Sequence, residues 1–239
     1  MKEDLSNLNC IYLDIETIPS EKEEFVFDKN NYTVPKTYAS SEEKRTKWLD
    51  EQMEKKFEKH DEKFLKQSLD KLKAKVICVS IIYPVSDTES AHDVVVSDDE
   101  ESLFKNIDTI CSSIPRRGYR TVVTFNGNNF DLPILALRAL KYKCGYLYDV
   151  VKMGKFDQRS LDLMTSFNFS DYRGMVSLDS LCKFFGLNGK YDGMSGADVY
   201  PAYLNGERDK IGEYCADDTY KLVQLHRILN QDLNKDTAI

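Results

Sequence analysis

The amino-acid sequence predicts a layered α/β fold. Short apolar runs typical of strands alternate along the chain with longer segments whose apolar residues recur at helical spacing. Such an alternation favours a sheet with helices packed on its faces. The 239 residues, 41% of them hydrophobic, are enough to bury a sizeable core, and no flexible linker or internal repeat divides them. We therefore expect a single domain over residues 1–239.

The first strand is predicted at residues 10–16, where apolar side chains occupy every second position. Asp14 and Glu16 fall on the alternate positions and therefore share the other face of the strand. Pro19 ends the run. Residues 21–75 then form a charge-rich segment with apolar side chains at roughly helical spacing, so we expect one long or two shorter helices as an insertion after the first strand.

The rest of the chain alternates between strands and helices and ends in helices. Strands are predicted at 76–83, 93–96, 121–127 and, more briefly, near 160–164. One helix is predicted through Cys111, with Ser97 or Asp98 as its cap. Further helices are predicted over 130–143, 176–186, 195–206 and 206–231. Gly186 and Gly206 are the expected stops of two of them.

Composition excludes several classes of protein. The net charge of −7 argues against coating nucleic acid or an anionic membrane through bulk electrostatics, so a polyanionic substrate would have to be held locally. The cysteines stand singly and the histidines have no ligand partner at metal-binding spacing, which argues against a disulfide framework and against zinc. With no signal-peptide pattern and no apolar run of membrane-spanning length, we expect a soluble, cytoplasmic protein without a membrane partner.

Two stretches place acids at the end of a predicted strand or a few residues beyond it. Asp14 and Glu16 would repel one another at a strand tip unless a cation lies between them, and carboxylate oxygens suit Mg²⁺ or Mn²⁺. Asp131 follows a predicted strand and the glycine turn of TFNGNNFDLP. It can equally be a helix cap that satisfies free amides. Each stretch alone is a weak signal.

In the last predicted helix, the helical period distinguishes two adjacent aspartates. Apolar residues three and four apart form one stripe, and Tyr214 and Asp218 fall within it. A carboxylate on such a stripe is expensive unless it is paired, protonated or metal-bound. His226 is predicted to lie at the surface or at the end of the helix. Asp217 falls on the polar side of the helix, together with Lys210, Glu213, Lys221 and Gln224.

Together the three stretches resemble the motifs of DEDD 3′–5′ exonucleases, in the subgroup related to the proofreading domain of family-B DNA polymerases. The matching residues are Asp14 and Glu16 for D-x-E, Asn126, Gly127, Phe130 and Asp131 for N-G-x-x-F-D, and Tyr214 and Asp218 for Y-x-x-x-D. The resemblance continues through SLDLM, around Asp162, and through the C-terminal helices, where it looks like stand-alone exonucleases of bacteria and phages. Glu213 stands where the sister subgroup carries histidine, which favours the tyrosine subgroup.

The resemblance implies a ribonuclease-H-like fold, with a mixed five-stranded sheet flanked by helices and the acids at one end of the central strand. It implies that two divalent cations, Mg²⁺ or Mn²⁺, are bound by Asp14, Glu16, Asp131 and Asp218. Tyr214 would orient the attacking water. The implied activity is metal-dependent 3′–5′ hydrolysis at single-stranded DNA ends, in replication, repair or recombination.

Contacts to the terminal nucleotide are expected from Thr17, Asn126, Asn129 and Phe130. Arg173 and Lys190, each beside a tyrosine, are candidates for phosphate contacts, although ordinary exposed loop positions explain them equally well.

Three alternatives stay open at this stage. The metal site does not distinguish sugars, so a 3′ exoribonuclease similar to ribonuclease D would carry the same acids. A catalytically inactive exonuclease fold could serve as a module that only binds nucleic-acid ends. The charged insertion is either a solvated helical face or an arm that docks a protein partner.

Overall fold

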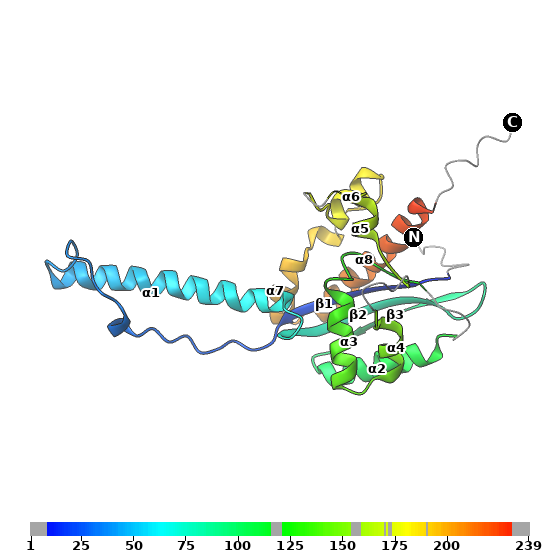
Figure 1. The fold of residues 1–239 in the computed structure, drawn as a ribbon, viewed down its shortest axis with the longest axis horizontal. Coiled ribbons are helices and arrows are strands. Elements are labelled where there is room, and N and C mark those ends of the chain that lie inside the picture. The colour runs from blue at the N-terminus through cyan, green and yellow to red at the C-terminus, as the bar shows by residue number, and fades with distance from the viewer. Residues whose placement is uncertain are drawn as a thin grey trace. The chain divides into compact units, whose positions relative to one another are not determined.

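The computed structural model describes residues 9–115, 121–153, 159–169, 171, 174–189 and 191–230. Within them, five strands form one sheet in the order β3-β2-β1-β4-β5 (Figure 1). β1 (Ile11–Pro19) pairs in parallel with β4 (Val122–Thr124), which pairs in parallel with β5 (Ser160–Asp162). β2 (Ala74–Pro84) and β3 (Ser90–Val96) are antiparallel. The predicted ribonuclease-H-like fold with a mixed five-stranded sheet is confirmed.

Helices connect and cover these strands. They are α2 (Glu100–Ser113), α3 (Asp131–Lys141), α4 (Gly145–Val151), α5 (Leu163–Phe167), α6 (Leu178–Phe184), α7 (Val199–Leu204) and α8 (Arg208–Leu229). In Figure 1, α2, α3 and α4 lie together on one side of the sheet, and α8 lies with α5 and α6 on the other. None of the helices in the described ranges combines the length and apolar character that a bilayer span requires.

The chain divides into two compact units, Ile18–Ala74 and the combination of Met1–Thr17 with Lys75–Ile239. The first unit, here called the insertion, holds α1 (Glu42–Leu65) between two 3-10 helices, η1 (Lys29–Asn31) and η2 (Lys66–Leu69). The segment predicted at 21–75 therefore contains one long helix, and most residues before that helix are not helical. The extended residues before α1 pack on it. Phe25 meets the Phe57 ring edge-on at 5.2 Å between centroids, and the Lys22 ammonium lies 2.8 Å from Asp61.

The central strand β1 is buried on both faces of the sheet. Tyr12 is 2% exposed and packs with residues of β2, β4 and α8, among them Ile82, Val123 and Leu225. Because side chains alternate along a strand, Asp14 and Glu16 lie on the same face as Tyr12, toward α8. The predicted sharing of a face by the two acids therefore follows from the register of β1.

Two residues of α8 were predicted at the surface and are buried instead. Lys221 is 4% exposed, because its ammonium lies 2.6 Å from a carboxylate oxygen of Asp217 and 2.8 Å from one of Asp218. His226 is 8% exposed, and its Nδ1 lies 2.8 Å from the Tyr12 hydroxyl. The surface position predicted for both residues was wrong, because a periodic pattern does not include the polar partners that compensate burial. The alternative for His226, the end of the helix, is confirmed by its place in the last turn of α8.

Several element boundaries also differ from the prediction, among them the following three. The cap of α2 is Asp99, which accepts a hydrogen bond from the Ser102 amide at 2.9 Å, while Asp98 pairs with Arg208. The helix predicted over 130–143 ends at Lys141 because Lys143 has a φ of 56°, and α4 follows as a separate helix. β4 ends at Thr124, three residues earlier than predicted.

The turn after β4 requires glycine at position 127. A Cβ built on Gly127 would lie 2.3 Å from Thr124 Oγ1 and 2.4 Å from its Cβ, and Thr124 is fully buried. Rotation of the threonine cannot relieve the second contact because its Cβ is fixed by the backbone.

Gly127→Ala should therefore destabilise the protein by about 1–3 kcal/mol, the usual cost of overpacking. Thermal unfolding checks this, with Gly145→Ala as the matched control, since nothing lies within 4 Å of a Cβ there. Equal melting temperatures for the two variants would contradict the steric argument.

Candidate active site

Asp14 and Glu16 are the fourth and sixth of the nine residues of β1, so they lie within the strand and not at the predicted tip. β1 continues past them to Pro19, while its paired neighbour β4 ends at Thr124. Glu16 is 8% exposed. Burial raises the pKa of both carboxyls well above their ordinary values, and the negative charges of Asp131 and Asp218 raise both further. The two acids predicted from the strand pattern are thus brought together with the acids of the other two stretches.

Asp131 is the first residue of α3 and is 3% exposed. Burial raises the pKa of its carboxyl to about 7, although hydrogen bonds from the backbone amides of Asp131 and Ile15 act in the opposite direction. The helix cap is Phe130, one residue earlier. The position of Asp131 beside β1, rather than capping, explains its burial.

α8 supplies Asp218 and Tyr214 from successive turns of the helix. The Asp218 side chain is 14% exposed, and burial raises the pKa of its carboxyl while the Lys221 ammonium lowers it. Burial also raises the pKa of Tyr214, as do the negative charges of Asp218, Glu16 and Asp14. The Tyr214 hydroxyl therefore stays protonated and forms a hydrogen bond with Asp218.

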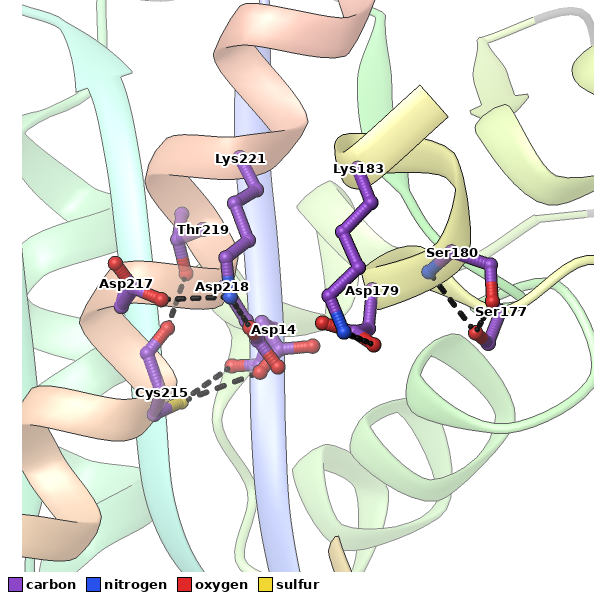
Figure 2. A network of polar contacts seen from close by, with 10 residues as sticks. All are labelled: Asp14, Ser177, Asp179, Ser180, Lys183, Cys215, Asp217, Asp218, Thr219 and Lys221. Atoms are coloured by element: carbon purple, nitrogen blue, oxygen red, sulfur yellow. Dashed lines mark hydrogen bonds and ion pairs between the residues drawn. The ribbon is translucent and has the colours of Figure 1, made fainter. Parts of the chain in front are cut away.

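The choice between the adjacent aspartates of α8 is visible in Figure 2. The Asp218 side chain extends toward Asp14, whereas that of Asp217 points away from it. Asp217 is 31% exposed and pairs with the buried ammonium of Lys221. Asp217 therefore acts as the counter-ion of a lysine.

Cys215 is a neighbour of the acids that the sequence analysis missed. Its thiol donates to Asp14, with Sγ 3.5 Å from both the backbone oxygen and Oδ2 (Figure 2). Candidate ligand atoms of Asp14, Glu16 and Cys215 all lie within 4.8 Å of one another. Burial raises the pKa of the Cys215 thiol, so the sulfur keeps its proton as a donor. The one sequence signal is its spacing, three residues before Asp218 on the inward side of the helix.

Asp162 was noted only as part of the family resemblance, and the structure gives it a defined contact set. Its buried carboxylate accepts hydrogen bonds from the amides of Asn126 at 2.9 Å and Asn128 at 3.3 Å. It also caps α5 through the amides of Met164 at 3.1 Å and Thr165 at 3.5 Å. Asp162 thereby ties the end of β5 to the turn that leads into Asp131. An acid between a short strand and a helix is the signal that could have found it.

The four residues predicted to contact a nucleotide lie at two places. Asn126, with a φ of 60°, Asn129 and Phe130 belong to the turn between β4 and Asp131, and the Asn129 amide donates to the Asn126 side chain at 3.2 Å. Thr17 is 8% exposed and, by strand alternation, lies on the face of β1 opposite Asp14 and Glu16. These contacts remain predictions. Arg173 and Lys190 lie outside the described residues.

The donor set fits hard divalent cations. Within this set, the negative charges of Asp131 and Asp218 raise the pKa of Asp14 and Glu16, as expected where carboxylates are crowded together. Mg²⁺ and Mn²⁺ prefer oxygen ligands of this kind. The residues expected to hold such ions are Asp14, Glu16, Asp131 and Asp218.

A ribonuclease-H-like sheet with acids gathered at its central strand defines a class of metal-binding fold that carries nuclease sites. Within that class, the chain belongs to the family of predicted 3′–5′ exonucleases related to the exonuclease domain of PolB, which matches residues 62–236. No curated protein matches the chain. The matched residues include Asp131, Tyr214 and Asp218, while Asp14 and Glu16 precede the matched range. The proximity of these two acids to the other three residues is therefore a finding of the structure.

Replacing Asp131 should show how much the buried carboxylate lowers the stability of the metal-free protein. The carboxyl has a pKa near 3.8 when unfolded and about 7 when folded, so the folded protein binds more protons and the stability it contributes is lost as the pH rises through 7. Asp131→Asn cannot ionise. Its melting temperature should exceed that of the wild type by about 5 °C at pH 8 and by much less at pH 4.5. A gap that does not change with pH would contradict the raised pKa.

Replacing Asp162 should weaken metal binding although it is not a ligand. Loss of a group that orients a ligand costs about 10–100-fold in metal affinity, so Asp162→Ala should raise the Kd for Mn²⁺ by that factor. The Kd of Asp162→Asn, which keeps one acceptor oxygen, should lie between those of the wild type and Asp162→Ala. Calorimetric titration measures both, with the exposed Asp149→Ala as control. Wild-type affinity in a folded Asp162→Ala protein would remove its positioning role.

Proposed function

We propose that the protein is a metal-dependent 3′–5′ exonuclease that removes nucleotides from single-stranded DNA ends. The observation that carries this proposal is the convergence of four acids from β1, α3 and α8, in which Asp131 and Asp218 lie close enough to raise the pKa of both Asp14 and Glu16. Membership of the predicted exonuclease family supports the same reaction class. A module that only binds nucleic-acid ends would have no need to bury four carboxylates together.

The residues of the site would have two roles, which are to hold the cations and to orient the attacking water. Two divalent cations, when bound, supply an activated water and stabilise the charge on the leaving 3′ oxygen. Asp14, Glu16, Asp131 and Asp218 would hold them. The Tyr214 hydroxyl, protonated and adjacent to Asp218, is suited to orient the attacking water through a hydrogen bond.

Lys221 and Cys215 position two of the ligands. The buried ammonium of Lys221 lies 2.8 Å from an oxygen of Asp218, which fixes that carboxylate along the helix. The Cys215 thiol does the same for Asp14 from the facing side. Each group donates a hydrogen bond to a carboxylate and adds no negative charge to the site. The carboxylate oxygens therefore stay available to cations.

A single strand suits this site because unstacked bases can meet an aromatic ring. Phe130, half-buried directly before Asp131, is the ring nearest to a ligand in sequence, and Asn129 beside it is exposed. The acids act on the phosphodiester and do not read the sugar, so parallel digestion of matched DNA and RNA strands decides between deoxyribonuclease and exoribonuclease activity.

Direction and metal dependence are tested together by digesting one strand labelled at either end. With Mn²⁺ present, the 3′ label should leave at once as a mononucleotide while the 5′-labelled strand shortens stepwise, and EDTA should stop both. Asp218→Asn should reduce the rate about 10³-fold, equivalent to about 4 kcal/mol of barrier. The matched control is Asp217→Asn, the adjacent acid, which should keep most activity.

Three results would contradict this proposal. Cleavage from the 5′ end would reverse the polarity, and cleavage in EDTA would remove the metals. Equal loss in the Asp217 and Asp218 variants would mean that the helix does not select one carboxylate for the site.

A further inference from the structure

The exposed charges of α1 are sorted by sign around the helix. At about 100° per residue, six cations fall within a band about 120° wide. This band, here called the basic stripe, consists of Lys44, Arg45, Lys55, Lys56, Lys59 and Lys63, all exposed. Glu62, at its edge, is the acid that falls within it. Glu43, Asp50, Glu54 and Asp61 lie together on another side of the helix.

The basic stripe carries like charges at the spacing where they repel. Lys55, Lys59 and Lys63 follow one another at intervals of four residues, and each such like-charge pair costs a helix about 0.2–0.5 kcal/mol. Among the described residues, none of the six cations has a carboxylate within 4.0 Å. Lys56 instead lies over the Tyr32 ring, 6.0 Å from its centroid. The six cations therefore form no ion pair within the part of the chain that the structure describes, although Glu51 and Glu58 lie four residues before and three residues after Lys55 on the neighbouring side of the helix.

The insertion also differs in charge from the rest of the chain. Residues 18–74 contain 13 lysines and arginines and 13 aspartates and glutamates, so their charges cancel. The net charge of −7 therefore belongs to the residues of the other unit, which carries the acidic site. A polyanion repelled by that unit meets no net repulsion from the insertion and is attracted to the stripe.

We propose that the basic stripe of α1 binds the sugar-phosphate backbone of a nucleic-acid strand. The inference rests on the proposed function only for the choice of polyanion. From Lys44 to Lys63 the stripe is about 29 Å long at 1.5 Å per residue, so several phosphates can lie along it (Figure 1). Sequence-independent binding of this kind needs cations at regular intervals and no base contacts.

The basic stripe and the acidic site are connected covalently, so a nucleic-acid strand bound at one of them can reach the other. The insertion leaves β1 after the Asp14–Glu16 pair and returns as β2, so stripe and acids belong to one chain whatever their separation. A strand held by one of two linked sites reaches the other at raised effective concentration. Strands long enough to engage both sites should therefore bind more tightly than short ones.

An acidic protein segment is a less suitable occupant because the basic stripe has no apolar anchor. Protein interfaces draw most of their binding energy from buried aromatic and apolar side chains. The exposed apolar residues of α1, Met53, Phe57 and Leu65, lie outside the stripe. Trp48, which does fall within the band, is half-buried against Tyr32 and Tyr38.

The test compares two triple variants that lose the same charge. Lys55→Gln, Lys59→Gln and Lys63→Gln remove half of the basic stripe, and Lys29→Gln, Lys36→Gln and Lys47→Gln remove three exposed cations of the insertion outside it. Both are made in the full chain with Asp218→Asn, so that strands are not cut. Binding of a labelled thirty-nucleotide single strand is followed by anisotropy across a salt series, with labelled polyglutamate as a second probe.

The stripe variant should bind the strand more weakly at low salt, and its slope of log affinity against log salt should shrink by about 2, at about 0.7 per lost phosphate contact. The control should keep the wild-type slope. Equal changes in both variants would assign the effect to net charge and overturn the proposal. So would stripe-dependent binding of polyglutamate without stripe-dependent binding of DNA. If the wild type never cuts but binds in this stripe-dependent way, the proposed function fails and this inference stands.

Discussion

Four buried or half-buried carboxylates gathered beside the middle of β1 repel one another, and several neighbouring groups reduce that repulsion. Backbone amides of Asp131 and Ile15 point at the Asp131 carboxylate. The Cys215 thiol donates to Asp14, and the buried Lys221 ammonium approaches Asp218. These donors reduce the cost of burial without cancelling it, because the pKa values of the acids stay raised. Divalent cations are the partners that such a cluster lacks.

The same residues separate what the sequence could predict from what it could not. Alternation in β1 predicted that Asp14 and Glu16 share a face, and the helical period in α8 predicted that Tyr214 and Asp218 face the core, because periodicity is a local property. Lys221 and His226 were placed at the surface, since their burial depends on partners three residues away or more than two hundred. The clamp formed by Asp162 was missed for the same reason. Its partners Asn126 and Asn128 are distant in sequence and are bound through backbone amides.

The insertion shows how a neutral segment can hold a strong local charge. The insertion has equal numbers of acidic and basic residues, so its net charge does not show that the two signs lie on different sides of α1. The helical geometry shows it, because Lys55, Lys59 and Lys63 follow one another along one line of the helix. In the preceding extended segment, Phe25 packs on Phe57 outside the basic stripe and Tyr32 packs on Trp48 within it, while the six cations of the stripe stay exposed. Net charge therefore describes the long-range field of this protein and not the surfaces that can bind a ligand.

The central claim is that the acids of β1, α3 and α8 are kept together for divalent cations. Calorimetric titration of the metal-free protein with Mn²⁺ at pH 7, repeated in buffers of different ionisation enthalpy, measures both the number of ions bound and the protons released. Two ions should bind to the site. Because burial raises the pKa of Asp131 to about 7, its carboxyl is still partly protonated in the metal-free protein at pH 7, so protons should be released. Binding without proton release, or no binding at all, would contradict it.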